Sequence, residues 1–110
     1  MKCENLSEAL LYITEKHGRK RLLDKSCIIG CLVDYFPNGK AERQILESAF
    51  ALGIPAKLVK AARKDTIEQD IVILRSISQL NSNFGIDMEV AEDILQIYGE
   101  ALGFEKCYTV

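Results

Sequence analysis

The sequence predicts an all-α fold, a compact bundle of five to six helices. Apolar residues recur at the spacing of one helix face in several segments, and good N-cap residues precede most of them. Three of these segments run into glycine followed at once by a large apolar residue: Leu52-Gly53-Ile54, Phe84-Gly85-Ile86 and Leu102-Gly103-Phe104. Glycine accepts the left-handed conformation that ends many helices, and the apolar residue behind it packs onto the last turn.

The first two helices are expected before residue 37. Asn5 is the N-cap of the first, with Glu8 three residues on, and Gly18 ends it. Asp24 is the N-cap of the second, which is expected from Lys25 to Phe36. Its expected buried face consists of Ile28, Ile29, Leu32, Val33 and Phe36.

Proline and glycine separate the next two helices. Pro37-Asn38-Gly39 predicts a tight turn, after which a third helix is expected from Lys40 to Leu52. That helix is expected to bury Ile45, Leu46, Ala49 and Phe50. Pro55 suits the first turn of a short fourth helix that continues to Ala62.

The fifth expected helix is the longest, from about Thr66 to Phe84, and its N-cap is either Asp65 or Thr66. Apolar residues follow two lines along it, so we expect it to cross the centre of the bundle. One line consists of Ile67, Ile71, Leu74, Ser78 and Asn81, and the other of Ile73, Ile77 and Leu80.

Asp87 caps the sixth expected helix, from about Met88 to Leu102, and the acidic residues of its first turn suit the helix dipole. Its expected inward side chains are Val90, Ala91, Ile94, Leu95 and Tyr98. The tail 104–110 either packs through its aromatic residues or is loose. Gly30 and Gly99 lie inside expected helices, where we expect a close helix–helix approach, with a kink or a partner's docking point as the alternative.

Length and composition indicate one domain, 1–110. The chain has 48% apolar residues, which is enough for a core, and a net charge of -2. No apolar run has the roughly 20 residues that a bilayer span needs. The beginning of the sequence has no apolar signal segment, so we expect a cytoplasmic protein with four reduced cysteines.

Charge is distributed unevenly along the chain. Two runs, 16–25 and 57–64, are basic, whereas the start of the last helix is acidic. Opposite charges at separate places favour binding to another copy or to a similar domain. The expected partner-binding residues are Arg19, Lys20, Arg21, Lys57, Lys60, Arg63, Lys64, Asp87, Glu89, Glu92 and Asp93.

The alternative for the same basic residues is a nucleic-acid or phosphate-binding helical module. The run 57–64 is mostly lysine, which suits phosphate contact better than the reading of base edges. No aromatic residue interleaves with these charges, so stacking on single strands is not supported.

Cysteines, the one histidine and paired carboxylates are the remaining candidates for chemistry. Cys27 and Cys31 share a helix face, but the other soft ligands are scattered single residues, so buried thiols are favoured over a metal site. A regulatory disulfide between Cys3 and Cys107 is the alternative use of the terminal thiols. His17 suits a helix C-terminus. Glu89 and Asp93 fit a solvated first turn, so we expect no enzymatic activity, cofactor or metal.

Several segments together resemble a helical accessory module of bacterial multidomain signalling proteins. The matching segments are 17–24, 32–37, 43–46 leading to 53–54, and 84–91 leading to 101–103. The resemblance implies an adaptor or scaffold role and brings no catalytic residues. The helix number and the opposed charges are also similar to those of death-fold adaptor domains. We therefore expect a non-enzymatic protein–protein interaction domain that acts through complementary charged faces.

Overall fold

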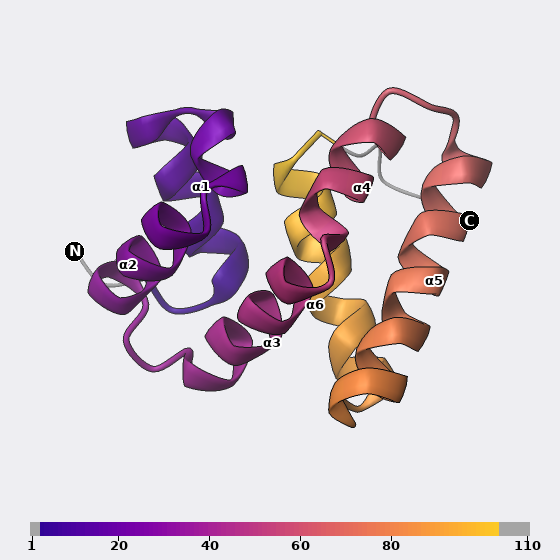
Figure 1. The fold of residues 1–110 in the computed structure, drawn as a ribbon. Helices are drawn as coiled ribbons and strands as arrows, with labels where there is room; N and C mark the ends of the chain where they lie inside the picture. The colour runs from indigo at the N-terminus through magenta and orange to yellow at the C-terminus, as the bar shows by residue number, and fades with distance from the viewer. Residues whose placement is uncertain (1–2, 104–110) are drawn as a thin grey trace.

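The computed structural model describes residues 3–103 and arranges them in six α-helices and one 3-10 helix (Figure 1). In chain order these are α1 (Leu6–His17), η1 (Arg19–Leu23), α2 (Lys25–Tyr35), α3 (Lys40–Ala51), α4 (Ile54–Ala61), α5 (Thr66–Phe84) and α6 (Met88–Ala101). The predicted all-α bundle is confirmed for this part of the chain. The expectation for the tail 104–110 lies outside the described residues.

Side-chain caps begin four of the helices at the predicted positions. Each cap oxygen accepts a backbone N–H group that the first turn leaves without an intrahelical partner. The caps are Asn5 for α1, Asp24 for α2, Asp65 for α5 and Asp87 for α6. The side chain of Asp65, rather than that of Thr66, therefore caps the longest helix.

The predicted glycine stops are also present. Gly85 has a φ of 68°, its N–H donates to the Asn81 carbonyl at 2.9 Å, and the N–H of Ile86 donates to the Leu80 carbonyl at 3.4 Å. The bond from Gly85, which reaches the carbonyl four residues back, is that of the αL cap. Gly53 and Gly103 likewise have positive φ values, 72° and 107°. Local chemistry at these glycines therefore ends three helices.

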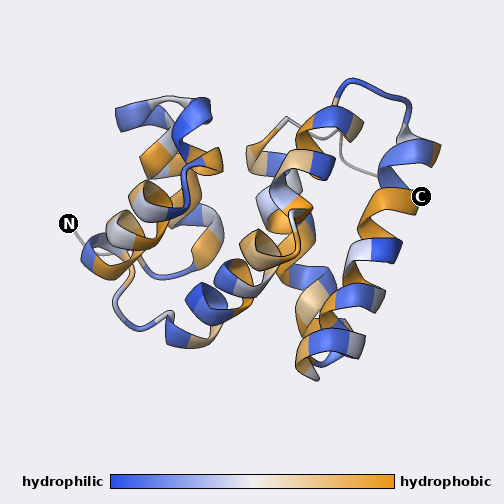
Figure 2. Ribbon diagram, viewed as in Figure 1, coloured by the Kyte–Doolittle hydropathy of each residue, from blue (hydrophilic) through white to orange (hydrophobic). Residues whose placement is uncertain are grey.

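The centre of the bundle is α6, which packs against α1, α3 and α5. It buries Ala91, Ile94, Leu95, Tyr98 and Gly99. Most of the other helices turn an apolar face inward and a polar face outward (Figure 2). The radius of gyration is 13.0 Å, which is the value expected of a folded chain of this length.

The expectation that the fifth helix crosses the centre is wrong. In Figure 1, α5 lies at the edge of the molecule, and its neighbours are α3, α4 and α6. The line of Ile77 and Leu80 is buried against them, whereas Ile67 and Leu74 on the other line are 69% and 64% exposed. The helical spacing of the apolar residues does not show which of the two lines faces a neighbouring helix and is buried.

Three smaller expectations also need correction. Val33 and Val90 are exposed rather than buried. Gly30 is exposed, and a Cβ atom placed on it would meet nothing within 4 Å, so no helix approaches closely there. Gly99, in contrast, is buried in the central helix. Gly30 and Val33 lie on an exposed side of α2 that no other helix of residues 3–103 covers.

Candidate functional site

The two basic runs meet in space, although about 40 residues separate them in the sequence. Arg19 and Lys20 on η1, and Arg63 just after α4, line one hollow of about 330 Å³. Leu23, Val59, Ala62, Leu102 and Gly103 complete its lining. We call this hollow the basic cleft. It joins three parts of the chain: η1, the end of α4 and the end of α6.

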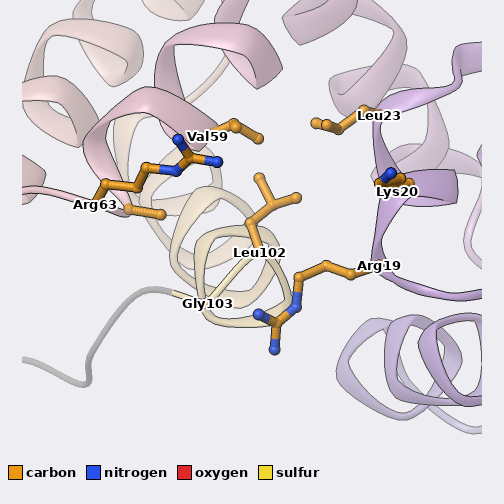
Figure 3. Close-up of a pocket in the computed structure, with 8 residues that line it drawn as sticks. Arg19, Lys20, Leu23, Val59, Arg63, Leu102 and Gly103 are labelled. Carbon is orange, nitrogen blue, oxygen red and sulfur yellow. The ribbon is translucent and has the colours of Figure 1, made fainter.

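Apolar side chains form the floor of the basic cleft. Figure 3 shows Leu23 and Val59 pointing toward each other from opposite walls, with Leu102 between them and the two arginines on opposite sides. A second hollow of about 390 Å³ shares Leu23 and Val59 and adds Lys60 to the basic rim. From here on the basic cleft includes both hollows, whose combined lining offers cationic groups around an apolar surface.

A buried hydrogen bond fixes the η1 wall of the basic cleft. The Tyr98 hydroxyl in α6 donates to the Leu22 carbonyl in η1, and both side chains are fully buried. Burial raises the pKa of Tyr98 well above its ordinary value of 10, so the phenol is protonated at neutral pH. This bond holds η1, and with it Arg19, Lys20 and Leu23, against the central helix.

A second buried side chain fixes the opposite wall. Gln69 of α5 is 3% exposed, and its Nε2 donates to the carbonyls of Ala62 at 3.4 Å and Lys64 at 3.1 Å. These two carbonyls flank Arg63 in the sequence. The turn that carries Arg63 is therefore held by a side chain of the next helix.

Arg19 is packed onto the C-terminal end of α6. Its Nη1 lies 3.1 Å from the position that a Cβ atom on Gly103 would take. Carbonyl groups at a helix C-terminus carry partial negative charge, so a guanidinium there stabilises the helix. Arg19 therefore has a structural role in addition to its place in the cleft.

The other cleft cations, Lys20, Lys60 and Arg63, form no ion pair within the described part of the chain. The ion pairs found within residues 3–103 are Arg21 with Asp24 at 3.9 Å and Lys64 with Glu68 at 4.0 Å. Neither pair includes Lys20, Lys60 or Arg63. The rim of the basic cleft thus carries positive charge that no described carboxylate neutralises.

Three of the predicted basic residues do not line either hollow. Arg21 and Lys64 turn toward the carboxylates named above, and Lys57 is exposed elsewhere on α4. Val59, Lys60 and Arg63 line the two hollows from α4 and from the turn that follows it. The predicted basic residues therefore divide into a cleft group and an outer group.

The predicted acidic residues lie far from the basic cleft, at the other end of α6. Asp87 is the N-cap, and Glu89, Glu92 and Asp93 are exposed on the first half of the helix. The helix has 14 residues, so its two ends are about 21 Å apart. One molecule therefore does not bring the opposite charges together, and pairing between them needs a second molecule.

The apolar floor of the basic cleft is not predicted from the sequence. Leu23 and Leu102 were not among the expected site residues, and no helix was expected over Arg19–Leu23. The sequence contains one signal for this floor: the apolar pair Leu22-Leu23 interrupts a run of charged residues. Leu22 is fully buried and Leu23 is 38% exposed, which distinguishes the core residue from the cleft residue.

The cysteines lie outside the basic cleft. Cys3 is free and buried, and burial raises the pKa of its thiol. Cys27 and Cys31 are free and half-buried. Burial is the main cause that raises the pKa of the Cys31 thiol, and the neighbouring Cys27 raises it further. Within residues 3–103 no group of histidine, cysteine and carboxylate side chains is arranged to hold a metal ion. The alternative disulfide of Cys3 involves Cys107, which lies outside the described residues.

None of the helices over residues 3–103 has both the length and the apolar character to cross a membrane. Comparison of the chain with protein-family models, with curated proteins and with solved structures finds no match.

Proposed function

We propose that this chain is a non-enzymatic protein-interaction domain whose basic cleft binds an acidic segment of a protein partner. The observation that carries the proposal is the meeting of the two basic runs around one apolar floor. A segment that fits this lining has carboxylates for the rim and one large apolar side chain for the floor.

The apolar floor supplies most of the binding free energy in this proposal. A single exposed ion pair contributes about 0 to 1 kcal/mol, whereas burying one large apolar side chain contributes about 1.5 to 3 kcal/mol. The cationic rim adds orientation and a faster association rate, because charge steers the encounter. Binding therefore weakens as salt rises, without being abolished.

A protein partner fits the lining better than duplex DNA does. The cations surround an apolar hollow instead of forming a continuous basic stripe, and Phe50 is the one aromatic residue among the described residues that line the two hollows. The resemblance to bacterial accessory modules also favours an adaptor role. Duplex DNA is the competing ligand in the test.

The test is a fluorescence-anisotropy titration with a labelled peptide that contains glutamates around one phenylalanine. The cleft variant is K60E/R63E, and the matched control is K16E/K57E, which changes the net charge equally at two lysines that line neither hollow. We expect the cleft variant to bind about tenfold or more weakly, which corresponds to about 1.4 kcal/mol. We expect the control to match the wild type.

Two results would contradict the proposal. One is an equal loss of peptide binding in the cleft variant and the control, which would mean that net charge alone binds the peptide. The other is tighter binding of duplex DNA than of the peptide, with a steep fall between about 50 and 200 mM salt. The second result would support the nucleic-acid alternative.

A further inference from the structure

The turn between α5 and α6 and the first half of α6 carry exposed carboxylates, which the lining of the basic cleft lacks. Glu89 and Asp93 are exposed and have no cationic partner in the described part of the chain. Glu92 is exposed as well, and its Oε1 accepts only from the neighbouring Gln96 side chain, at 3.4 Å. The beginning of α6 thus carries negative charge that no described cation neutralises.

Large apolar side chains are exposed beside these carboxylates. Phe84 is 47% exposed, Met88 52% and Val90 44%. Phe84 and Val90 line one shallow hollow together with Asp87, so apolar and acidic groups share this surface. Helical spacing makes Met88 a neighbour of Glu92, and Val90 a neighbour of Asp93. We call these four residues, together with Phe84, the acidic corner. Clustered exposed apolar side chains with a charged rim are typical of interaction surfaces.

The acidic corner matches the partner segment that the basic cleft requires. It has carboxylates for the rim of Lys20, Lys60 and Arg63, and it has a phenylalanine or methionine side chain for the apolar floor. Building on the proposed function of the cleft, we infer that its partner is the acidic corner of a second copy of this chain.

The geometry makes this contact head to tail. Leu102 and Gly103 of the basic cleft follow the C-terminal end of α6, and the acidic corner is at its N-terminal end; Figure 1 shows the course of the helix between the two ends. Each copy therefore keeps one free cleft or one free corner after pairing. Such a contact produces rings when its rotation closes and open chains when it does not.

The contact is small. Stable interfaces bury about 1,200 to 2,000 Å² in total, whereas this one joins a single hollow to one helix turn. Assembly is therefore expected to be weak and dependent on concentration, and strongest at low salt, where unpaired charges attract over a longer distance.

A mixing experiment tests the inference. The variant K60E/R63E has a blocked cleft and an intact corner, and E92Q/D93N has a weakened corner and an intact cleft. The second variant spares the Asp87 cap and the first turn of α6. By light scattering at low salt, the wild type and the control K16E/K57E should grow in mass with concentration, and each variant alone should remain a monomer. An equimolar mixture of the variants should stop at twice the 12.3 kDa chain mass.

Two results would overturn the inference: a mixture that stays at the monomer mass, or variants that assemble alone as well as the wild type. The peptide titration on E92Q/D93N separates this outcome from failure of the proposed function, because that variant keeps an intact cleft. Peptide binding with a monomeric mixture would leave the cleft a docking site and remove the second copy as its partner. Absence of peptide binding would contradict both.

Discussion

Replacing Tyr98 by phenylalanine removes the hydrogen bond on which the η1 wall depends. The hydroxyl donates to the Leu22 carbonyl inside the fully buried core, so its loss leaves a buried carbonyl without that donor. An unsatisfied buried polar group costs about 1 to 3 kcal/mol. At about 4 °C per kcal/mol for a chain of this size, the midpoint of thermal unfolding should fall by about 4 to 12 °C.

The matched control is Tyr12→Phe. Tyr12 is half-buried, its ring meets Tyr35 edge-on at a centroid distance of 4.7 Å, and its hydroxyl has no hydrogen bond to a described residue. The same atom is deleted without loss of a bond, so we expect a change below about 0.5 kcal/mol. Circular dichroism with heat and with urea measures both variants. Equal stability of Y98F and Y12F would refute the assigned role of the bond.

The pH dependence gives a second test of Tyr98. Below pH 10 the phenol is protonated in both the folded and the unfolded chain, so its contribution to stability is complete. Above pH 10 the unfolded chain releases the proton, whereas the folded chain retains it because burial raises the pKa. The wild type should therefore lose up to about 1.4 kcal/mol per pH unit more than Y98F does. A constant difference between the two proteins from pH 9 to 11 would contradict this reasoning.

Two further predictions concern the glycines and the thiols. Gly30→Ala should raise the free energy of unfolding by about 1 kcal/mol, because the helix gains a better former in open space. Gly85→Ala should lower the free energy of unfolding by about 1 to 2 kcal/mol, because alanine is strained at a φ of 68°. Urea unfolding measures both variants. A change of the same sign in both would contradict the roles given to these two glycines. A thiol reagent, followed by mass spectrometry of peptides, should label Cys27 well before the buried Cys3. Faster labelling of Cys3 would show that this end of the core opens readily.

The helix boundaries were predictable because capping is local chemistry. Asp24 and Asp87 accept N–H groups two or three residues ahead, and the N–H of Gly85 donates to a carbonyl four residues back. Such interactions depend on nearby sequence alone. The buried face of each helix was harder to predict. Ile67 and Ile77 belong to two equally regular apolar lines on α5, and only the neighbouring helices decide which line is buried.

The candidate site was predictable only in part. Its charged residues stand out as runs in the sequence, but their meeting depends on long-range contacts. The bond between Tyr98 and Leu22 spans 76 residues, and no periodicity indicates it. Lys57 and Lys60 are three residues apart and therefore neighbours on α4, so helical spacing alone does not show that only Lys60 lines a hollow.

Methyl NMR spectra recorded during a titration with the acidic peptide would test the central claim most directly. The floor of the basic cleft consists of methyl-bearing residues from three elements, Leu23, Val59 and Leu102. The account predicts that their signals shift first and saturate together, whereas those of exposed Leu74 on α5 stay unchanged. Shifts spread evenly over the surface, or confined to α5, would contradict the claim that the basic cleft is the docking site.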